Sequence, residues 1–305
     1  MNQTIVAYIK ISLAMAIVGS SVVAGKLILS SFPIFLASEF RFVIAAFILV
    51  PLLLWKEKRI PIIKPKVLFI LFLQALTGVF LFNIFMLYGL KFTTAIEAGV
   101  ITSTLPAVIG VISFIFLKER LTMGKMTGIT FAVIGVLLIN VINEGTSSGN
   151  SLLGNSLILG AVLTEALFIT LGKSVSSKVT PLTISTMMSL FGLILFLPFA
   201  IHESSNFNFS TVGIMDWLNI LYFGVIITVV AFLLMYQGLS KISASSAGIL
   251  TSMLPLSTVI LSFLILKEEI LFSHVIGMLF VLVAIFILSK EPTTEEKESE
   301  TAISP

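Results

Sequence analysis

The sequence predicts an all-α integral membrane protein with ten transmembrane helices, arranged as two inverted five-helix repeats. Hydrophobic residues make up 57% of the 305 residues and charged residues only 11%, which is more apolar surface than one globular core could bury. Residues 89–106 (GLKFTTAIEAGVITSTLP) recur 149 positions later, at 238–255 (GLSKISASSAGILTSMLP), with nine identities in eighteen positions. The register continues through the Leu-Lys-Glu of 117–119 and 266–268, so the two halves look like copies of one unit.

An apolar helix needs about 20 residues to cross the hydrocarbon of a bilayer. By that rule the chain contains ten spans, at residues 5–29, 33–54, 67–88, 93–116, 125–142, 152–173, 181–201, 215–237, 243–266 and 273–289. Polar or helix-breaking segments separate them. We therefore assign residues 1–142 to the first repeat, 143–151 to a linker, 152–289 to the second repeat and 290–305 to a disordered, polar cytoplasmic tail.

Lysine and arginine residues predict the orientation. With a cytoplasmic N-terminus, the inner loops and tail carry thirteen of these residues and the outer side carries three, as the positive-inside rule requires. Both termini are then cytoplasmic, and the expected location is the plasma (inner) membrane of a prokaryote. Because each repeat has an odd number of spans, the second repeat must cross in the opposite sense. That arrangement is typical of secondary transporters with a binding site near the midplane.

The composition argues against several kinds of site. Cysteine is absent and the two histidines, His202 and His274, are isolated, so we expect no metal site. A phosphate-binding loop with the Gly-x4-Gly-Lys spacing is also missing. We therefore expect no cofactor, no nucleic-acid partner and no enzymatic activity, and any driving force for transport should be a gradient.

Glu165 is the strongest candidate for a substrate-binding or coupling residue. It lies 13 residues into the sixth predicted span, which is roughly 20 Å along a helix and close to the centre of a bilayer. A charged carboxyl is costly at that depth, so we expect it to face the interior of the bundle. A substrate amine or a proton is the expected ligand. The alternative is a neutral glutamic acid that serves only a helix contact.

Weaker candidates lie in the first helix pair and at the start of the fourth span. Lys26 and Glu39 lie at similar depth on either side of the turn and could pair, whereas Glu39 and Arg41 point to different faces. An ion pair that locks the two helices explains these charges as well as a gate or substrate site does. Glu97 lies about one turn into its span, where we interpret it as an interfacial or outer-vestibule residue.

The repeated stretch itself indicates helix geometry rather than ligand chemistry. Gly99 and Gly248 belong to runs of small residues that let helices approach closely. Pro106 and Pro255 each remove one backbone N–H near the middle of a span, so they predict matched kinks. Such kinks would suit a central cavity, although proline is also common in transmembrane helices. The small-residue faces could serve a homodimer as well as packing within one chain.

The pattern G-L-x7-A-G-x2-T-S-x-L-P followed by L-K-E, present in both halves, resembles the EamA domain of the drug/metabolite transporter superfamily. The opening helix pair with its Arg41-Phe42 is similar too, although the second half has Met188 and Ser189 near that point. The resemblance covers nearly all of residues 5–289. It implies a ten-helix basket around a central cavity, with Glu165 and Gln74 as candidates for the lining.

The resemblance also implies a function. Similar proteins are most often assigned efflux of amino acids or related compounds, so we expect a secondary active transporter that works by alternating access, driven by proton exchange or by the cargo's own gradient. An importer or facilitator of a sugar, carboxylate or cofactor is the nearest alternative. An integral membrane enzyme acting on lipids is a distant one, because the scattered glutamates form no catalytic cluster. The expected partners are a small-molecule substrate and the lipid bilayer.

Overall fold

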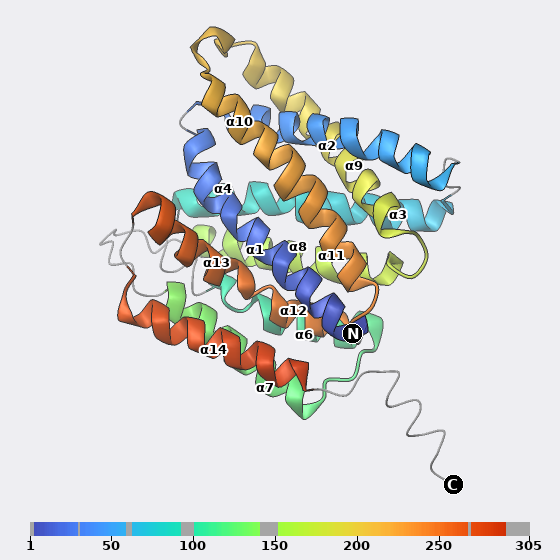
Figure 1. Ribbon diagram of the computed structural model, residues 1–305, viewed down its shortest axis with the longest axis vertical. Helices are drawn as coiled ribbons and strands as arrows, with labels where there is room; N and C mark the ends of the chain where they lie inside the picture. Colours follow the sequence, from blue (N-terminus) through green and yellow to red (C-terminus); the bar gives the residue numbers. More distant parts are fainter. Residues whose placement is uncertain are drawn as a thin grey trace.

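The computed structural model describes residues 3–29, 31–58, 63–92, 101–140, 152–267 and 270–290, which form helices and turns without a β-strand (Figure 1). Within this part of the chain, eight helices are long and apolar enough to cross a membrane. Two more predicted spans are represented by shorter apolar helices, at 105–117 and 123–138. The prediction of an all-α membrane protein is confirmed.

The first repeat begins with α1 and α2 and continues as one long rod with a π-helical middle. Its helices are α1 (Gln3–Leu29), α2 (Ile34–Glu57), the rod α3 (Pro65–Gln74), η1 (Ala75–Leu81) and α4 (Phe82–Phe92), then α6 (Leu105–Leu117) and α7 (Met123–Asn140). Glu97 and Gly99 lie outside the described residues, as do the predicted linker at 143–151 and residues 291–305 of the predicted tail. The predicted repeat boundaries therefore stay predictions.

The second repeat follows the same order. Its helices are α8 (Leu152–Val175), α9 (Pro181–Ser204), the short turn η2 (Phe209–Thr211), the rod α10 (Ile214–Tyr222), η3 (Phe223–Val230) and α11 (Ala231–Leu239), then α12 (Ala244–Leu250), α13 (Met253–Leu261), η4 (Ser262–Leu266) and α14 (Phe272–Ser289). Shifting the first π-helical segment by the repeat offset of 149 gives residues 224–230. Both rods thus widen at equivalent positions, which the sequence did not predict.

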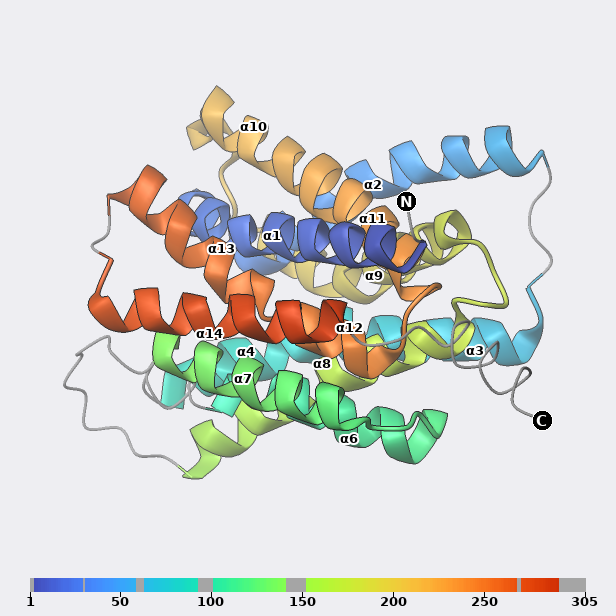
Figure 2. The ribbon, with the colours of Figure 1, turned by 60° about the horizontal axis from the view of Figure 1, so that its bottom comes forward.

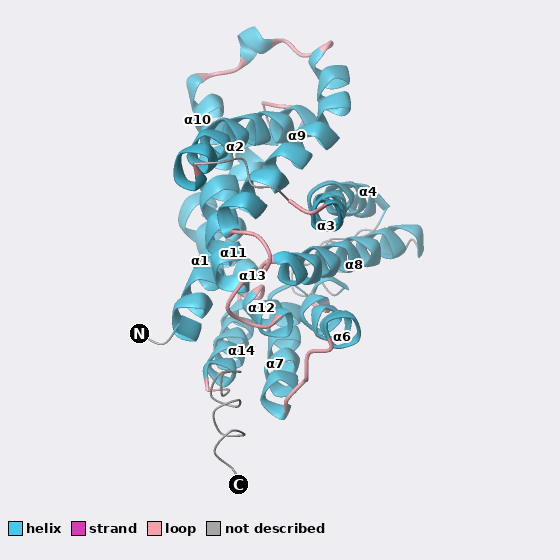
Figure 3. Cartoon of the chain, turned by 90° about the vertical axis from the view of Figure 1, so that its right-hand side faces the viewer, coloured by secondary structure: helices cyan, strands magenta, loops and turns pink. Residues whose placement is uncertain are grey.

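The helices of one repeat pack on those of the other with matching partners. Helix α1 packs on α11 and α13, and its counterpart α8 packs on α4 and α6. Figure 3 shows α8 between the α3–α4 rod and α6. The second helices of the two repeats, α2 and α9, pack together, and so do the last ones, α7 and α14, which run side by side in Figure 2. The core therefore lies between the repeats, around the buried Phe42, Phe196 and Tyr236.

The helices next to Pro106 and Pro255 are interrupted rather than bent. Turns at 103–104 and 251–252 come directly before α6 and α13. Hydroxyl groups beside the breaks bond to upstream carbonyls: Thr104 Oγ1 donates to Ile101 O at 2.6 Å and Thr251 Oγ1 to Gly248 O at 2.6 Å. Such bonds satisfy backbone groups that the break exposes. Proline alone is insufficient, because Pro51 and Pro198 lie inside continuous helices.

Glycine permits the closest approach between α1 and the second broken helix. A Cβ added at Gly19 would overlap Ser257 Oγ and lie 2.5 Å from the backbone oxygen of Leu254. A Cβ at Gly25, on the same helix, would meet only Phe223 at 3.8 Å. Position 19 therefore has no room for a methyl group, whereas position 25 does.

We expect Gly19→Ala to destabilise the protein by about 1–3 kcal/mol, since α1 and α13 must move apart. Gly25→Ala is the matched control and should be neutral or stabilising by up to about 1 kcal/mol, because alanine favours a helix. Unfolding of the detergent-solubilised variants, followed by fluorescence-detected size exclusion after heating, measures both changes. Equal unfolding temperatures for the two variants would contradict the close approach.

Candidate functional site

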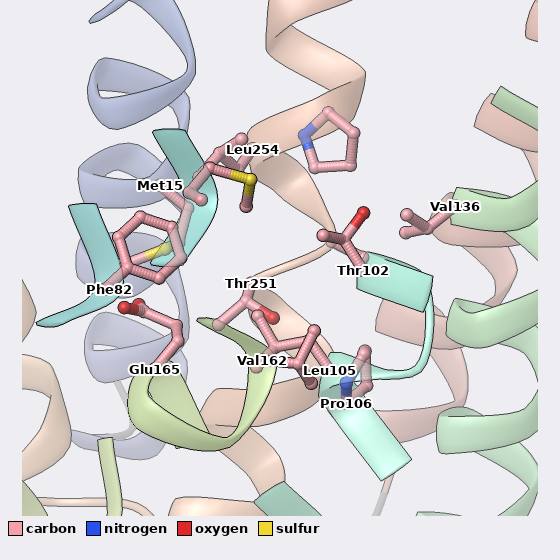
Figure 4. Close-up of a pocket in the computed structure, with 13 residues that line it drawn as sticks. Met15, Phe82, Thr102, Leu105, Pro106, Val136, Val162, Glu165, Thr251 and Leu254 are labelled. Atoms are coloured by element: carbon pink, nitrogen blue, oxygen red, sulfur yellow. The ribbon is translucent and has the colours of Figure 1, made fainter. Parts of the chain in front are cut away.

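A cavity of about 220 Å³ lies where both broken helices meet α1, α4 and α8 (Figure 4). Its walls are largely apolar. The lining residues are Met15, Phe82, Met86, Thr102, Leu105, Pro106, Val136, Val162, Glu165, Thr251, Ser252, Leu254 and Pro255. The two copies of the repeated Thr-Ser-x-Leu-Pro segment thus face the same space, as an approximate twofold relation between the repeats requires.

Glu165 supplies the carboxylate of this cavity. Residues Ile158, Ala161, Val162 and Ile169 form the buried stripe of α8, and position 165 falls on the same stripe at helical spacing. Figure 4 shows the carboxylate directed toward Phe82 and Met15. It makes no hydrogen bond or ion pair with any described residue. The carboxylate is therefore available to a ligand, and its predicted place in the bundle interior agrees with the structure.

The two half-helices that follow the breaks begin at the cavity. Helix α6 starts at Leu105 and α13 at Met253, and the repeated Leu-Pro pairs 105–106 and 254–255 belong to the lining. Proline has no N–H group, and Leu254 N donates to Thr251 O at 3.0 Å. The cavity therefore combines one negative side chain with hydroxyl groups of the two repeated segments, separated by apolar surface.

Gln74, predicted to line the cavity, instead lies behind it. Its side chain is fully buried, and its Nε2 donates to Phe168 O at 3.0 Å and to Tyr236 Oη at 2.9 Å. Tyr236 is close enough to Glu165 for the two groups to interact electrostatically. Gln74 therefore fixes the phenol next to Glu165, and any effect it has on a ligand is exerted through Tyr236.

The charged residues of α2 do not join this site. Glu39 is buried, and its Oε2 has no hydrogen-bond partner among the described residues. The guanidinium carbon of Arg41 lies 4.5 Å from the centre of the Phe42 ring, and its Nε is likewise unpartnered within that part of the chain. Neither residue belongs to the cavity lining. The side chain of Lys26 is not described, so its pairing with Glu39 stays a prediction.

One residue that the sequence interpretation did not single out, Glu119, connects the two repeats. Its carboxylate accepts hydrogen bonds from Ala244 N at 2.7 Å, Ser245 N at 3.0 Å and Ser245 Oγ at 2.8 Å. A carboxylate at a helix N-terminus is stabilised by the unpaired N–H groups and the helix dipole. Glu119, from the segment after α6, thus caps α12 of the other repeat.

Helix α12 comes directly before Thr251 and Ser252, which line the cavity. Each of its seven residues is buried, and it leads directly to the break at 251–252. Its start belongs to the end of the molecule where α2, α6, α8 and α11 terminate, on the right of Figure 2. We call it the lysine-rich end, after Lys56, Lys118, Lys178 and Lys241. The only sequence signal for the role of Glu119 was its place in the repeated Leu-Lys-Glu.

Comparison with known proteins identifies what the chain is similar to. The model of the EamA-like transporter family matches residues 5–141 and 152–290. The chain is 46% identical over 300 residues to the uncharacterized transporter YetK of Bacillus subtilis, covering 95% of this chain and 91% of YetK. It is 26% identical to the protein PagO of Salmonella typhimurium, with 79% of each chain covered.

A solved crystal structure has the same fold. The similarity covers 96% of this chain and 98% of that chain, with a TM-score of 0.76 and 16% sequence identity. Because the sequence identity is this low, the similarity shows only that the helices are arranged in the same way. It agrees with a two-repeat membrane bundle.

Proposed function

The chain belongs to the EamA-like transporter family and is a multi-pass membrane protein related to bacterial transporters, and we propose that it carries small zwitterionic metabolites, such as amino acids, through the cavity at Glu165. The proposed direction is export across the plasma membrane, with both termini cytoplasmic. Its relatives are named transporters, which points to a role other than catalysis.

The observation that carries this proposal is one unpartnered carboxylate in a small, largely apolar cavity. The carboxylate of Glu165 suits a substrate ammonium group. Apolar residues such as Phe82 and Leu254 remain for the rest of the molecule. A sugar carries no positive charge for Glu165, so an amine-bearing, amino acid-like cargo is favoured.

Alternating access follows from the contacts between the repeats. For the cavity to open at the lysine-rich end, α12 must separate from α6 and from the capping carboxylate of Glu119. We propose that this end faces the cytoplasm, since the lysine and arginine residues concentrate there. On this proposal the described arrangement, in which Glu119 caps α12, is the state closed toward the cytoplasm, and cargo release toward the outside would follow it.

Transport in proteoliposomes tests the proposal. Purified protein is reconstituted with a pH-sensitive dye inside the vesicles, and a panel of radiolabelled amino acids, sugars and carboxylates is offered at equal concentration. We expect counterflow of one or more amino acids and little of the other classes, with proton movement when transport is coupled. Saturable counterflow of sugars or carboxylates, with none of amino acids, would overturn the assignment of the substrate class.

A further inference from the structure

A second cavity, of about 1170 Å³, lies at the lysine-rich end, between α2, the start of α9 and the end of α11. It shares no residue with the cavity at Glu165. Its floor is apolar, with Leu52, Leu182 and Leu233, and its rim is basic. The proposed transport through the cavity at Glu165 therefore assigns no ligand to this second cavity.

The basic rim carries more positive than negative charge. Four lysines line the cavity, Lys10, Lys56, Lys58 and Lys241, against one acid, Glu57. That acid already accepts hydrogen bonds from the hydroxyls of Thr180 and Thr183. Lys10 Nζ donates to Gln237 Oε1 at 2.7 Å, whereas Lys56, Lys58 and Lys241 pair with no described residue. The rim is therefore free to bind an anion.

The helix α2 beside the cavity carries exposed aromatic residues that suit a lipid-facing surface. On α2, Phe47 is 81% exposed and Trp55 is 78% exposed, which is the pattern of a face that meets hydrocarbon and ends at the headgroup level. Trp55 belongs to the cavity lining, directly before Lys56. The apolar floor, the interfacial tryptophan and the basic rim succeed one another along the cavity. A phospholipid presents its parts in the same order: the acyl chain would meet the floor, the glycerol region the tryptophan and the phosphate the rim.

We propose that this cavity binds an anionic phospholipid, with its phosphate among Lys56, Lys58 and Lys241 and its acyl chain against Leu52 and Leu233. Basic pockets between transmembrane helices are suited to anionic headgroups, and each lysine near the surface strengthens the attraction about fivefold. The lipid would contact α2 of one repeat and α11 of the other.

The two tryptophans of the chain make the site directly observable. Trp217 packs against Phe32 and Phe40 at ring-centre distances of 5.3 and 5.4 Å, and Phe40 lies fifteen residues before Trp55 on α2, which is about 22 Å along the helix. Trp217→Phe therefore leaves Trp55 as the single reporter, next to the basic rim. Brominated lipids quench tryptophan only at short range.

The test compares quenching of Trp55 by brominated phosphatidylglycerol and by brominated phosphatidylcholine, at equal mole fraction, in reconstituted Trp217→Phe protein. We expect selective quenching by the anionic lipid, and a loss of about fivefold in that selectivity for each lysine removed in Lys56→Gln and Lys241→Gln. The control pair, Lys118→Gln and Lys125→Gln, removes the same charge from the segment around the start of α7 and should leave the selectivity unchanged.

Three outcomes would overturn the site. Equal quenching by both lipids would mean that the protein does not select the anionic lipid. A loss of selectivity in Lys118→Gln and Lys125→Gln as large as in the rim variants would mean that the selectivity comes from the general surface charge. Displacement of the quenching by millimolar inorganic phosphate would assign the pocket to a free anion instead. Trp55 emission in unbrominated lipid, identical across the variants, ensures that each one has kept its fold.

Discussion

Glu165→Gln is expected to lower substrate transport by roughly ten- to a hundredfold and to remove substrate-dependent proton movement. The range corresponds to the loss of one hydrogen bond to a charged group, which contributes about 1.5–3 kcal/mol. Glutamine has nearly the same shape but can neither carry the negative charge nor exchange a proton. Because the wild-type carboxylate makes no hydrogen bond or ion pair with a described residue, its replacement breaks no such bond and the fold should persist.

Two controls separate transport from general effects of removing an acid. Glu165→Asp keeps the charge and should retain coupling with weaker substrate binding. Glu57→Gln removes a carboxylate that lines the other cavity and should leave proton coupling intact. The measurement is counterflow and proton flux in proteoliposomes. Wild-type activity in Glu165→Gln would leave the transporter fold standing and remove Glu165 from the path.

Glu119→Gln is expected to raise the fraction of molecules open at the lysine-rich end by roughly ten- to a hundredfold. Three hydrogen bonds hold the carboxylate on the start of α12. The expected range corresponds to the loss of one charge-assisted bond, about 1.5–3 kcal/mol, since glutamine keeps one acceptor oxygen. Glutamine lacks the negative charge of Glu119, and its amide NH2 group would face the backbone N–H donors of α12, with which it cannot form a hydrogen bond. Helix α12 should then separate from α6 more often.

The chain contains no cysteine, so one introduced thiol reports this opening. Ser246→Cys is nearly isosteric and lies on α12, where Ser246 is only 4% exposed. The rate of maleimide labelling in membrane vesicles of each orientation should rise with Glu119→Gln, and only from the side of the lysine-rich end. Arg120→Gln, at the adjacent exposed position, is the control. An unchanged labelling rate would show that Glu119 does not hold this side closed.

The local pattern of the sequence was enough to predict most of the fold. Runs of about 20 apolar residues predicted the spans because a bilayer sets one length for every helix that crosses it. The duplicated stretch predicted the repeat, and the cost of a buried carboxyl predicted that Glu165 faces inward. Each of these inferences depends on residues close together in the chain.

The parts that were not predicted depend on distant contacts. Glu119 caps residues 125 and 126 positions away in the other repeat, and no spacing rule connects them. Gln74 was expected at the cavity, but its side chain turns to Tyr236, 162 positions away. Turns come directly before α6 and α13 near Pro106 and Pro255, whereas Pro51 and Pro198 leave their helices continuous. Composition alone could not separate these two kinds of proline.

The paired π-helical segments set how the two ends of each third helix face the rest of the bundle. A π-helical turn holds about one more residue than an α-helical turn, so the face that the helix presents before the segment is rotated relative to the face it presents after it. Such a turn occupies equivalent positions in the third helix of each repeat, at 75–81 and 223–230. The π-helical segment η4 at 262–266, in contrast, corresponds to the α-helical residues 113–117 of α6. The acidic residue Glu165 is likewise present in one repeat alone, since α1 contains no acidic residue. The two repeats therefore share the geometry of their third helices and differ in the charge of their first.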